Sequence, residues 1–148
     1  MNKINVKYVA LEGAVVPEYK TAGAAGADVC AYLPEGCVTI AAGKFAMIPT
    51  GVFYEIPDGY EIQVRPRSGL AAKNGITVLN TPGTIDSDYR GELKIILINL
   101  GDKDFTINHN DRIAQIIISP VIQAQFNPVQ NLSETERGSS GFGSTGVV

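Results

Sequence analysis

The last residues of the chain have the types and spacing of an anion-binding segment. Residues 137–146 read RGSSGFGSTG. Glycines let successive backbone N–H groups converge on an anion, and serine and threonine hydroxyls add donors. Arg137 can offer a planar charged fork to a phosphate, and Phe142 a ring that covers a base. The run lacks the lysine and following helix of a P-loop, and its composition alone also fits a flexible, solvated tail.

A second group of donors follows a strand-like segment that Pro66 ends by removing a ladder donor. Ser68 can cap a short helix, which Gly75 would end. Arg67, the Ser68 hydroxyl and the Gly69 N–H would then converge on one place, which suits a phosphate. The alternative is an ordinary strand exit into a capped helix.

Residues 80–92 combine turn signals with four charged side chains. Asp86 and Asp88 are two residues apart, so in an extended strand they share a face. One carboxylate can act as a general base on water, and Tyr89 can present its ring to a sugar. The alternative is a charged turn with local caps, which is the commoner use of Asp-Ser-Asp.

Two further polar residues lie in apolar strand-like segments. Asp28 is either a charge at a sheet edge or a ligand for a hard cation. Gln115 needs hydrogen-bond partners if it is buried, either backbone groups or a ligand oxygen. We favour a structural role for Arg112 and, by a small margin, for Gln115.

Strands are expected along most of the chain, and these strands must position the groups described above. Residues 3–8 and 60–65 alternate between apolar and polar side chains. Residues 93–98 and 113–118 are β-branched runs, typical of strands buried on both faces. The only helix expected covers residues 68–74. Frequent turn signals between these segments predict an all-β sandwich, barrel or jelly roll.

The totals of the chain predict one globular domain without a basic surface. The 148 residues are 45% hydrophobic and 18% charged, with a net charge of −3. Polymeric nucleic acid is therefore not expected as a partner. We expect residues 1–136 to form the β domain and residues 137–148 a flexible arm.

The rare residue types exclude several chemistries. Cys30 and Cys37 form neither a disulfide framework nor a CxxC pair, which indicates buried thiols in a reducing compartment. The single histidine, His109, is expected in a solvated loop, so a histidine-based triad or zinc site is poorly supported. Without a signal-like or membrane-spanning segment, the protein is expected to be soluble and cytoplasmic.

From Ala25 to Gly146 the chain resembles the homotrimeric dUTPase (deoxyuridine triphosphate nucleotidohydrolase) family. It carries the five family motifs in order: residues 25–29 (AGADV), 66–71 (PRSGLA), 83–92 (GTIDSDYRGE), 111–115 (DRIAQ) and the C-terminal arm. Thr84 stands where a larger aliphatic residue is common, and Ser139-Ser140 where a second glycine is usual. Neither departure removes a group with chemistry.

The resemblance implies a jelly-roll-like (β-clip) subunit in a homotrimer with shared active sites. It implies Mg²⁺-dependent hydrolysis of dUTP to dUMP and pyrophosphate by attack of water on the α-phosphorus. That reaction keeps uracil out of DNA and supplies dUMP for thymidylate synthesis. By the same resemblance, Asp86 is the base that deprotonates water, and Asp28 holds Mg²⁺ through water.

The remaining substrate-binding positions are also implied by the resemblance. Those for uracil and deoxyribose are Asn80, Thr84, Ile85, Tyr89 and Phe142, and those for the phosphates are Arg67, Ser68, Gly69, Gln115, Arg137, Ser144 and Thr145. Lys94 and Gly143 complete the expected site. Tyr89 would leave no room for a 2′-hydroxyl.

Two other functions remain open from the sequence. A deoxycytidine triphosphate deaminase shares this fold, but we expect it to lack the Asp86–Gly91 arrangement and the C-terminal arm. A non-catalytic nucleotide sensor would have no need of a base at Asp86.

Overall fold

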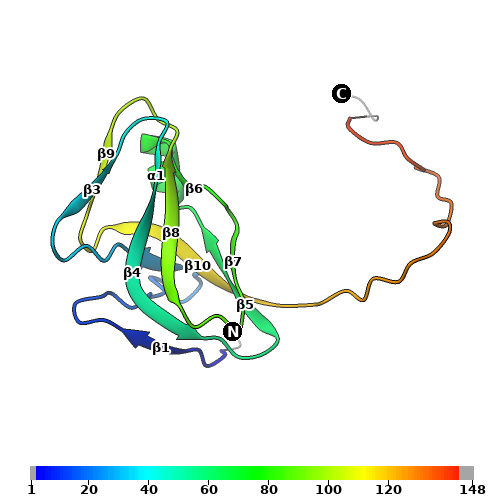
Figure 1. Ribbon diagram of the computed structural model, residues 1–148, viewed down its shortest axis with the longest axis horizontal. Helices are drawn as coiled ribbons and strands as arrows, with labels where there is room; N and C mark the ends of the chain where they lie inside the picture. Colours follow the sequence, from blue (N-terminus) through cyan, green and yellow to red (C-terminus); the bar gives the residue numbers. More distant parts are fainter. Residues whose placement is uncertain (1–2, 144–148) are drawn as a thin grey trace.

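The computed structural model of the chain describes residues 3–143 and consists mainly of strands (Figure 1). Its elements are β1 (Lys7–Ala10), β2 (Ala27–Cys30), β3 (Cys37–Ile40), β4 (Phe45–Glu55), β5 (Tyr60–Arg65), α1 (Ser68–Asn74), β6 (Ile76–Val78), β7 (Gly83–Ile85), β8 (Glu92–Asn99), β9 (Phe105–Asn108) and β10 (Arg112–Pro120). The predicted all-β class with a short helix is confirmed.

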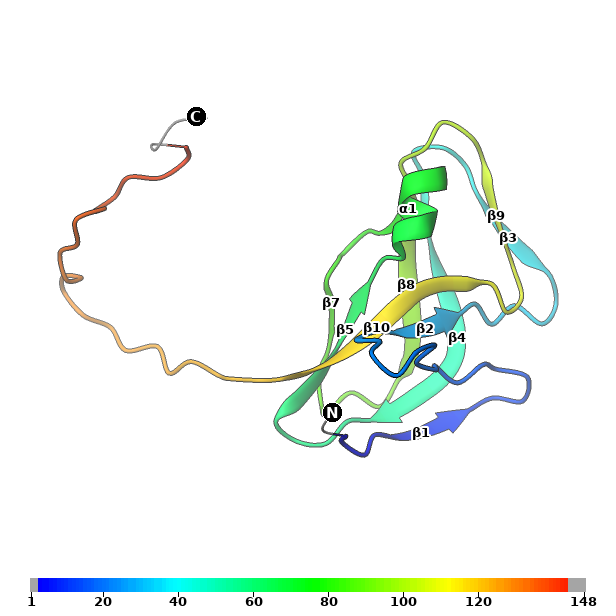
Figure 2. The ribbon, with the colours of Figure 1, turned by 180° about the vertical axis from the view of Figure 1, so that it is seen from behind.

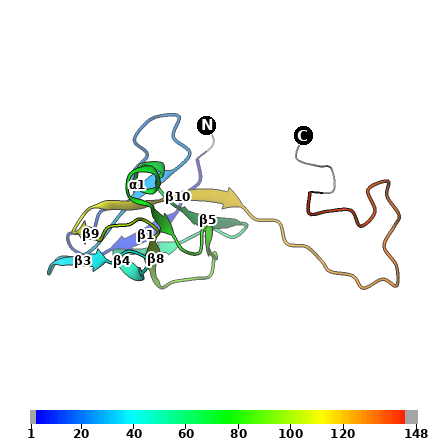
Figure 3. The same cartoon turned by 90° about the horizontal axis from the view of Figure 1, so that it is seen from above.

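Two antiparallel sheets of four strands form the body of the domain. Their strand orders are β1-β4-β8-β6 and β2-β10-β5-β7, and β3 pairs separately with β9. Seen from above, β10 and β5 lie in one layer, with β4 and β8 in the other (Figure 3). Apolar side chains from both sheets form one core, which includes Val29, Ile48, Ile62, Val64, Leu93, Ile95, Leu97 and Ile116.

The outer faces of the central strands correct one prediction. In β8, every second residue from Leu93 to Asn99 is buried, whereas Lys94 is exposed and Ile96 half-buried. In β10, Ile117 is half-buried as well and is not part of the core. The prediction that these runs are buried on both faces is therefore wrong for the single chain, because each sheet packs only one face on the core.

The helix α1 has the predicted range and end but not the predicted cap. Gly75 adopts a left-handed φ of 67°, and its N–H donates to the carbonyls of the last turn. Arg67, with extended φ and ψ, is the N-cap residue, and no side chain caps the helix. Ser68 is already helical, so its hydroxyl is one position too late for the capping role that we predicted.

The two ends of the described chain differ from the sheets between them. The first strand lies later than predicted, at Lys7–Ala10 instead of residues 3–8. After Pro120, residues 121–143 form no strand or helix and extend away from the domain (Figures 1 and 2). The boundary at residue 136 therefore stays a prediction. Within residues 3–143, no helix has the length and hydropathy to cross a membrane.

Candidate active site

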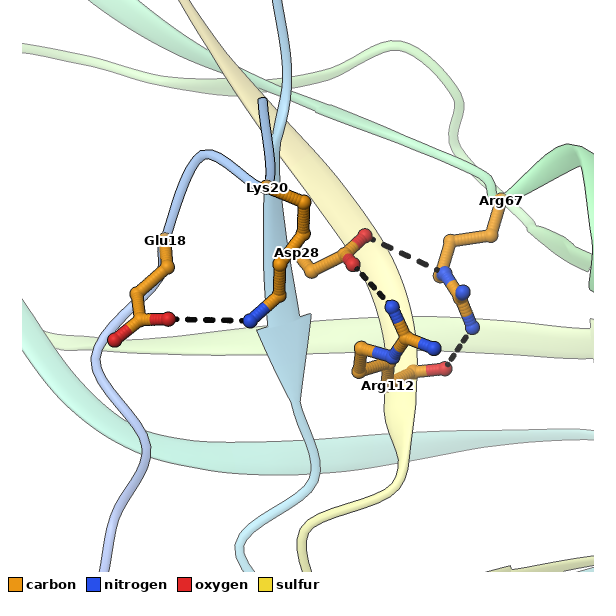
Figure 4. A network of polar contacts seen from close by, with 5 residues as sticks. All are labelled: Glu18, Lys20, Asp28, Arg67 and Arg112. Atoms are coloured by element: carbon orange, nitrogen blue, oxygen red, sulfur yellow. Dashed lines mark hydrogen bonds and ion pairs between the residues drawn. The ribbon is translucent and has the colours of Figure 1, made fainter. Parts of the chain in front are cut away.

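An ion-pair network joins β2, the segment after β5 and the start of β10 (Figure 4). Asp28 Oδ2 accepts a hydrogen bond from Arg112 Nη1 at 2.9 Å, and Asp28 Oδ1 lies 3.4 Å from Arg67 Nε. Arg67 Nη1 also donates to the Arg112 carbonyl oxygen at 2.9 Å. Two guanidinium groups and one carboxylate leave one positive charge in this network, which favours an anion.

Gln115 lies beside this network because β10 pairs with two strands at that residue. Its partners in the register are Asp28 in β2 and Arg65 in β5. Its Nε2 donates to the Pro66 carbonyl oxygen at 3.0 Å, which gives this part-buried amide a backbone partner. Gly26 leaves the space for it, since a Cβ there would overlap Gln115 Oε1 and lie 3.2 Å from Cδ.

A hollow of about 300 Å³ adjoins the network. It is lined by Arg67, Leu70, Phe105, Asp111, Arg112 and Ile113. Ser68 and Gly69 are exposed in the first turn of α1, directly after Arg67. The structure thus brings together five of the predicted phosphate and metal positions: Asp28, Arg67, Ser68, Gly69 and Gln115. Phe105 lies outside all five motifs, and Leu70 belongs to the second motif but was assigned no role there.

The acidic segment forms a strand end and a turn. β7 pairs with β5, and Asp86 follows its last residue, Ile85. The Tyr89 N–H donates to the Asp86 carbonyl at 3.2 Å, so Asp86 and Asp88 do not share the face of an extended strand, contrary to our prediction. A tight turn replaces the extended backbone there. Arg90 Nη1 braces it by donating to the carbonyls of Ser87 at 2.6 Å and Tyr89 at 3.0 Å.

A second hollow, of about 440 Å³, opens beside this turn. Its lining residues are Met47, Thr84, Ile85, Asp86, Tyr89, Glu92, Lys94 and Ile96. Five of them were predicted: Thr84, Ile85, Asp86, Tyr89 and Lys94. Asn80 lies nearby in the turn before β7, where its Nδ2 is 3.4 Å from the place of a Cβ on Gly83. Met47 and Ile96 were missed because they are ordinary strand residues; Glu92 belongs to the third motif.

The two hollows share no lining residue. The first is lined by two arginines, one aspartate and three apolar side chains, and the second by two carboxylates, a lysine, a threonine, an aromatic ring and three aliphatic side chains. A ligand with a charged tail and a flat, partly apolar head would match both. Within one chain, these two halves are separate.

The arm residues are not gathered at either hollow. Arg137 Nε donates to the Ser140 carbonyl at 2.9 Å, within the arm itself. The Phe142 side chain is fully exposed, and Gly143 follows it with a left-handed φ of 81°. Ser144 and Thr145 lie outside the described residues. In the single chain, residues 137–143 extend away from the sheets (Figure 1).

The rare residues have structural surroundings. His109 lies in a turn as predicted, but its Nδ1 accepts the Leu33 N–H at 2.9 Å and its ring meets Tyr32 edge-on at 5.6 Å. It is therefore held in place, and the prediction of a solvated side chain is wrong. Cys30 is buried, and burial with the nearby Asp28 charge raises the pKa of its thiol. Cys37 is exposed, contrary to the expected burial.

The side chains around Asp28 indicate how the predicted Mg²⁺ could be bound. Among residues 3–143, no group of three or more His, Cys, Asp or Glu side chains forms a metal cage. Asp28 supplies a single carboxylate whose two oxygens already face guanidinium groups. Mg²⁺ is commonly held by one carboxylate, waters and substrate phosphates, so these residues fit an ion that arrives with a polyphosphate and contacts Asp28 through water.

Comparisons with known proteins agree with the motifs. The dUTPase family model matches residues 12–146. A deoxyuridine 5'-triphosphate nucleotidohydrolase of Bdellovibrio bacteriovorus is 60% identical over 148 residues, 99% of each chain. The dUTPase of Staphylococcus bacteriophage 80alpha, solved with dUPNHPP, has a TM-score of 0.83 at 27% identity, covering 98% of this chain and 100% of that chain.

A third structure supports the fold alone. It is a mutant dUTPase from phage phi11 of S. aureus, studied for its coordination of a structural Mg(II) ion. It has a TM-score of 0.78 at 23% identity, covering 88% of this chain and 100% of that one. The family model spans most of this chain, and the Bdellovibrio relative is similar along its whole length. This chain therefore belongs to the dUTPase family.

Proposed function

We propose that this protein hydrolyses dUTP to dUMP and pyrophosphate, with water attacking the α-phosphorus. Membership of the dUTPase family supports this substrate and reaction. The observation that carries the proposal is the hollow lined by both Asp86 and Tyr89, which sets a carboxylate beside an aromatic wall. The reaction would remove a precursor of uracil in DNA and supply dUMP for thymidylate synthesis.

Asp86 is the proposed base. It follows β7, whose pairing with β5 fixes its backbone, and its exposed carboxylate can accept a proton from a water molecule. Tyr89 is the proposed wall against deoxyribose, where a 2′-hydroxyl would collide with the ring. Asn80, Thr84 and Ile85 surround the proposed uracil position, and Lys94 lies in the same hollow.

The α- and β-phosphates are proposed to bind Arg67, Ser68, Gly69 and Gln115. The positive charge of the Asp28 network and the exposed first turn of α1 support this assignment. We propose that Asp28 holds Mg²⁺ through water. When bound, Mg²⁺ would neutralise triphosphate charge, which is a main requirement of phosphoryl transfer.

A homotrimer with shared sites is the proposed assembly. The hollow that contains Arg67 and the hollow that contains Asp86 and Tyr89 share no lining residue in one chain, so a neighbouring chain can bring the complementary halves together. On β4, Phe45 and Met47 are 64% and 61% exposed, which leaves apolar surface for such a contact. Light scattering after gel filtration should give three times the mass of the chain; a fully active monomer would contradict the assembly.

The arm is proposed to close over bound nucleotide. Arg137 would reach the γ-phosphate, Phe142 would cover uracil, and Gly143, Ser144 and Thr145 would close over the phosphates. Deleting residues 137–148 should leave the melting temperature and oligomer nearly unchanged, because residues 137–143 contribute no side chain to the core. Activity should fall steeply as water exclusion and the Arg137 contact are lost. Intact activity after truncation would make the arm a spare tail.

Product analysis tests the reaction directly. The protein with Mg²⁺ should convert dUTP to dUMP and pyrophosphate, and ammonia release from dCTP would overturn the proposal. Asp86→Asn should lower kcat by roughly 10²–10⁴, the usual contribution of general-base catalysis, while nucleotide still binds. Asp88→Asn is the matched control, since it neutralises a carboxylate in the same turn. Equal effects of the two substitutions would place the base elsewhere.

A cytoplasmic location also belongs to the proposal. The thiols of Cys30 and Cys37 are free in the structure, as expected in a reducing compartment.

A further inference from the structure

Arg112 lies at the start of β10, beyond the end of its pairing with β5. The register runs from Pro120 back to Gln115, which faces Arg65, the last residue of β5. β10 continues to Arg112 with β2 as its neighbour, and its register to β2 shifts between Arg112 and Ala114. The Arg112 carbonyl thus lies beyond the β5 ladder, and the Arg67 guanidinium takes the place of a strand donor at 2.9 Å.

The Arg112 side chain acts on the same arginine through Asp28. It donates to Oδ2 of Asp28 at 2.9 Å, which leaves Oδ1 for Arg67 Nε at 3.4 Å (Figure 4). An arginine beside a free carboxylate prefers a bidentate pair, in which both oxygens bind one guanidinium edge. Because Arg112 occupies one oxygen, Arg67 is paired with Asp28 through a single contact.

This half-pairing determines what Arg67 can still bind. A guanidinium carries five N–H donors. The Nε donor faces Asp28, and one Nη1 donor binds the Arg112 carbonyl. Among residues 3–143, Nη2 of Arg67 donates no hydrogen bond, and Arg67 lines the hollow of about 300 Å³. The open edge is thus available to an anion in that hollow.

We propose that Arg112 is a positioning residue of the phosphate site: by holding one oxygen of Asp28, it keeps Arg67 half-paired and open to the polyphosphate of the nucleotide. This inference rests on the proposed role of Arg67. Without the Arg112 side chain, both Asp28 oxygens can bind Arg67. The ion pair then competes with the phosphates for the same donors.

Binding without metal tests this separately from catalysis. Calorimetry in EDTA with dUpNHpp and dUMP removes any effect on Mg²⁺. Arg112→Gln should weaken dUpNHpp binding by about 10- to 100-fold, by analogy with the loss when the hydrogen-bonded partner of a metal ligand is removed. Binding of dUMP, which has fewer phosphate contacts, should weaken by less. Arg112→Lys keeps a cation that can reach Asp28 and should recover most of the affinity.

A double variant distinguishes positioning from a simple structural strut. In Asp28→Asn/Arg112→Gln, the neutral amide cannot hold Arg67 by charge, so affinity should rise again relative to Arg112→Gln alone. A strut predicts losses that add or deepen. Lys20→Gln is the control for long-range charge, because Lys20 lies beside the network but pairs with Glu18 at 3.1 Å (Figure 4). It should bind like wild type.

The variants also separate failure of this inference from failure of the proposed site. If Arg67→Gln leaves dUpNHpp binding unchanged, Arg67 does not bind the phosphates, and the proposed site is wrong. If Arg67→Gln weakens binding but Arg112→Gln does not, only the positioning role is overturned. Additive losses in the double variant overturn it as well. Melting curves of every variant verify that the protein compared is folded.

Discussion

Replacing Gly91 with alanine should loosen the proposed sugar discrimination while the fold stays intact. Tyr89 folds back over Gly91, and its hydroxyl donates to the Glu92 carbonyl at 3.0 Å. A Cβ on residue 91 would overlap that hydroxyl and would lie 2.5 Å from Cζ and 2.9 Å from Cε2 of the ring. Ordinary carbon contacts are about 3.5–4.0 Å, so the ring must move outward by roughly 1 Å.

The structure indicates that this movement affects function more than stability. Gly91 has no left-handed φ, so alanine fits its backbone. The Tyr89 side chain is 46% exposed and can swing toward solvent. Loss of its hydrogen bond should lower the free energy of unfolding by about 0.5–1.5 kcal/mol at most. A displacement of about 1 Å in a substrate-positioning group can lower the rate by roughly 10².

The assay compares kcat/KM for dUTP and UTP in wild type and Gly91→Ala. We expect kcat/KM for dUTP to fall by roughly 10- to 100-fold and the preference over UTP to shrink, because the steric wall has moved. Tyr89→Phe in the same background removes the overlapping hydroxyl and should restore part of the preference. Gly36→Ala is the control, since a Cβ there meets nothing within 4 Å.

An unchanged preference for dUTP at wild-type kcat/KM would refute the reasoning. It would mean either that Tyr89 is not held by Gly91 or that discrimination lies elsewhere. A melting temperature that falls with activity would instead show that the alanine disturbs the fold.

Two further substitutions test the packing around the site. Gly26→Ala should raise KM for dUTP roughly tenfold with little change in melting temperature, because its Cβ displaces Gln115 Oε1; Gly23→Ala, in open space, should not. Tyr54 is buried, its hydroxyl has no partner among the described residues, and burial raises its pKa. Tyr54 therefore loses its proton less readily in the folded chain than in the unfolded chain. The stability that this difference contributes is fully present below the unfolded pKa of about 10 and is lost as pH rises through the higher native pKa. In urea unfolding at pH 7, Tyr54→Phe should be as stable as wild type or up to about 1 kcal/mol more stable. Above pH 10, wild type should lose stability relative to Tyr54→Phe. Equal losses of stability with pH in the two proteins would contradict this.

Local sequence signals predicted the elements whose ends are determined locally. The alternation of apolar and polar side chains predicted a strand at residues 60–65, which is β5, and Pro66 marked its end. Gly75 marked the end of α1 because a left-handed residue is favourable there. The Ser68 cap failed because a cap depends on which residue first becomes helical, and this differed by one position.

Contacts between distant segments were beyond the sequence alone. Asp28 and Arg112 are separated by 84 residues and meet only because β2 pairs with β10. Similarly, His109 is a backbone acceptor because its turn lies against Leu33. Motif order predicted the set of site residues by resemblance, and that set stays a prediction; it gave no indication that Asp28 is already paired with two arginines. Nothing in a run of side-chain types specifies such a pairing.

The register of β10 ties the candidate site to the core. Ile113, Ala114 and Ile116 are buried, and the shift between Arg112 and Ala114 lets two consecutive residues, Ile113 and Ala114, reach the core. The same shift sets Arg112 at Asp28, while Gln115 remains opposite Asp28 in the ladder. Slipping the strand by one residue would turn Gln115 toward the core and expose its apolar neighbours. Other registers of β10, which would separate the residues of the proposed phosphate site, are therefore unfavourable because they would expose core residues. The positions of Arg112 and Gln115 beside Asp28 thus do not depend on the charged side chains alone.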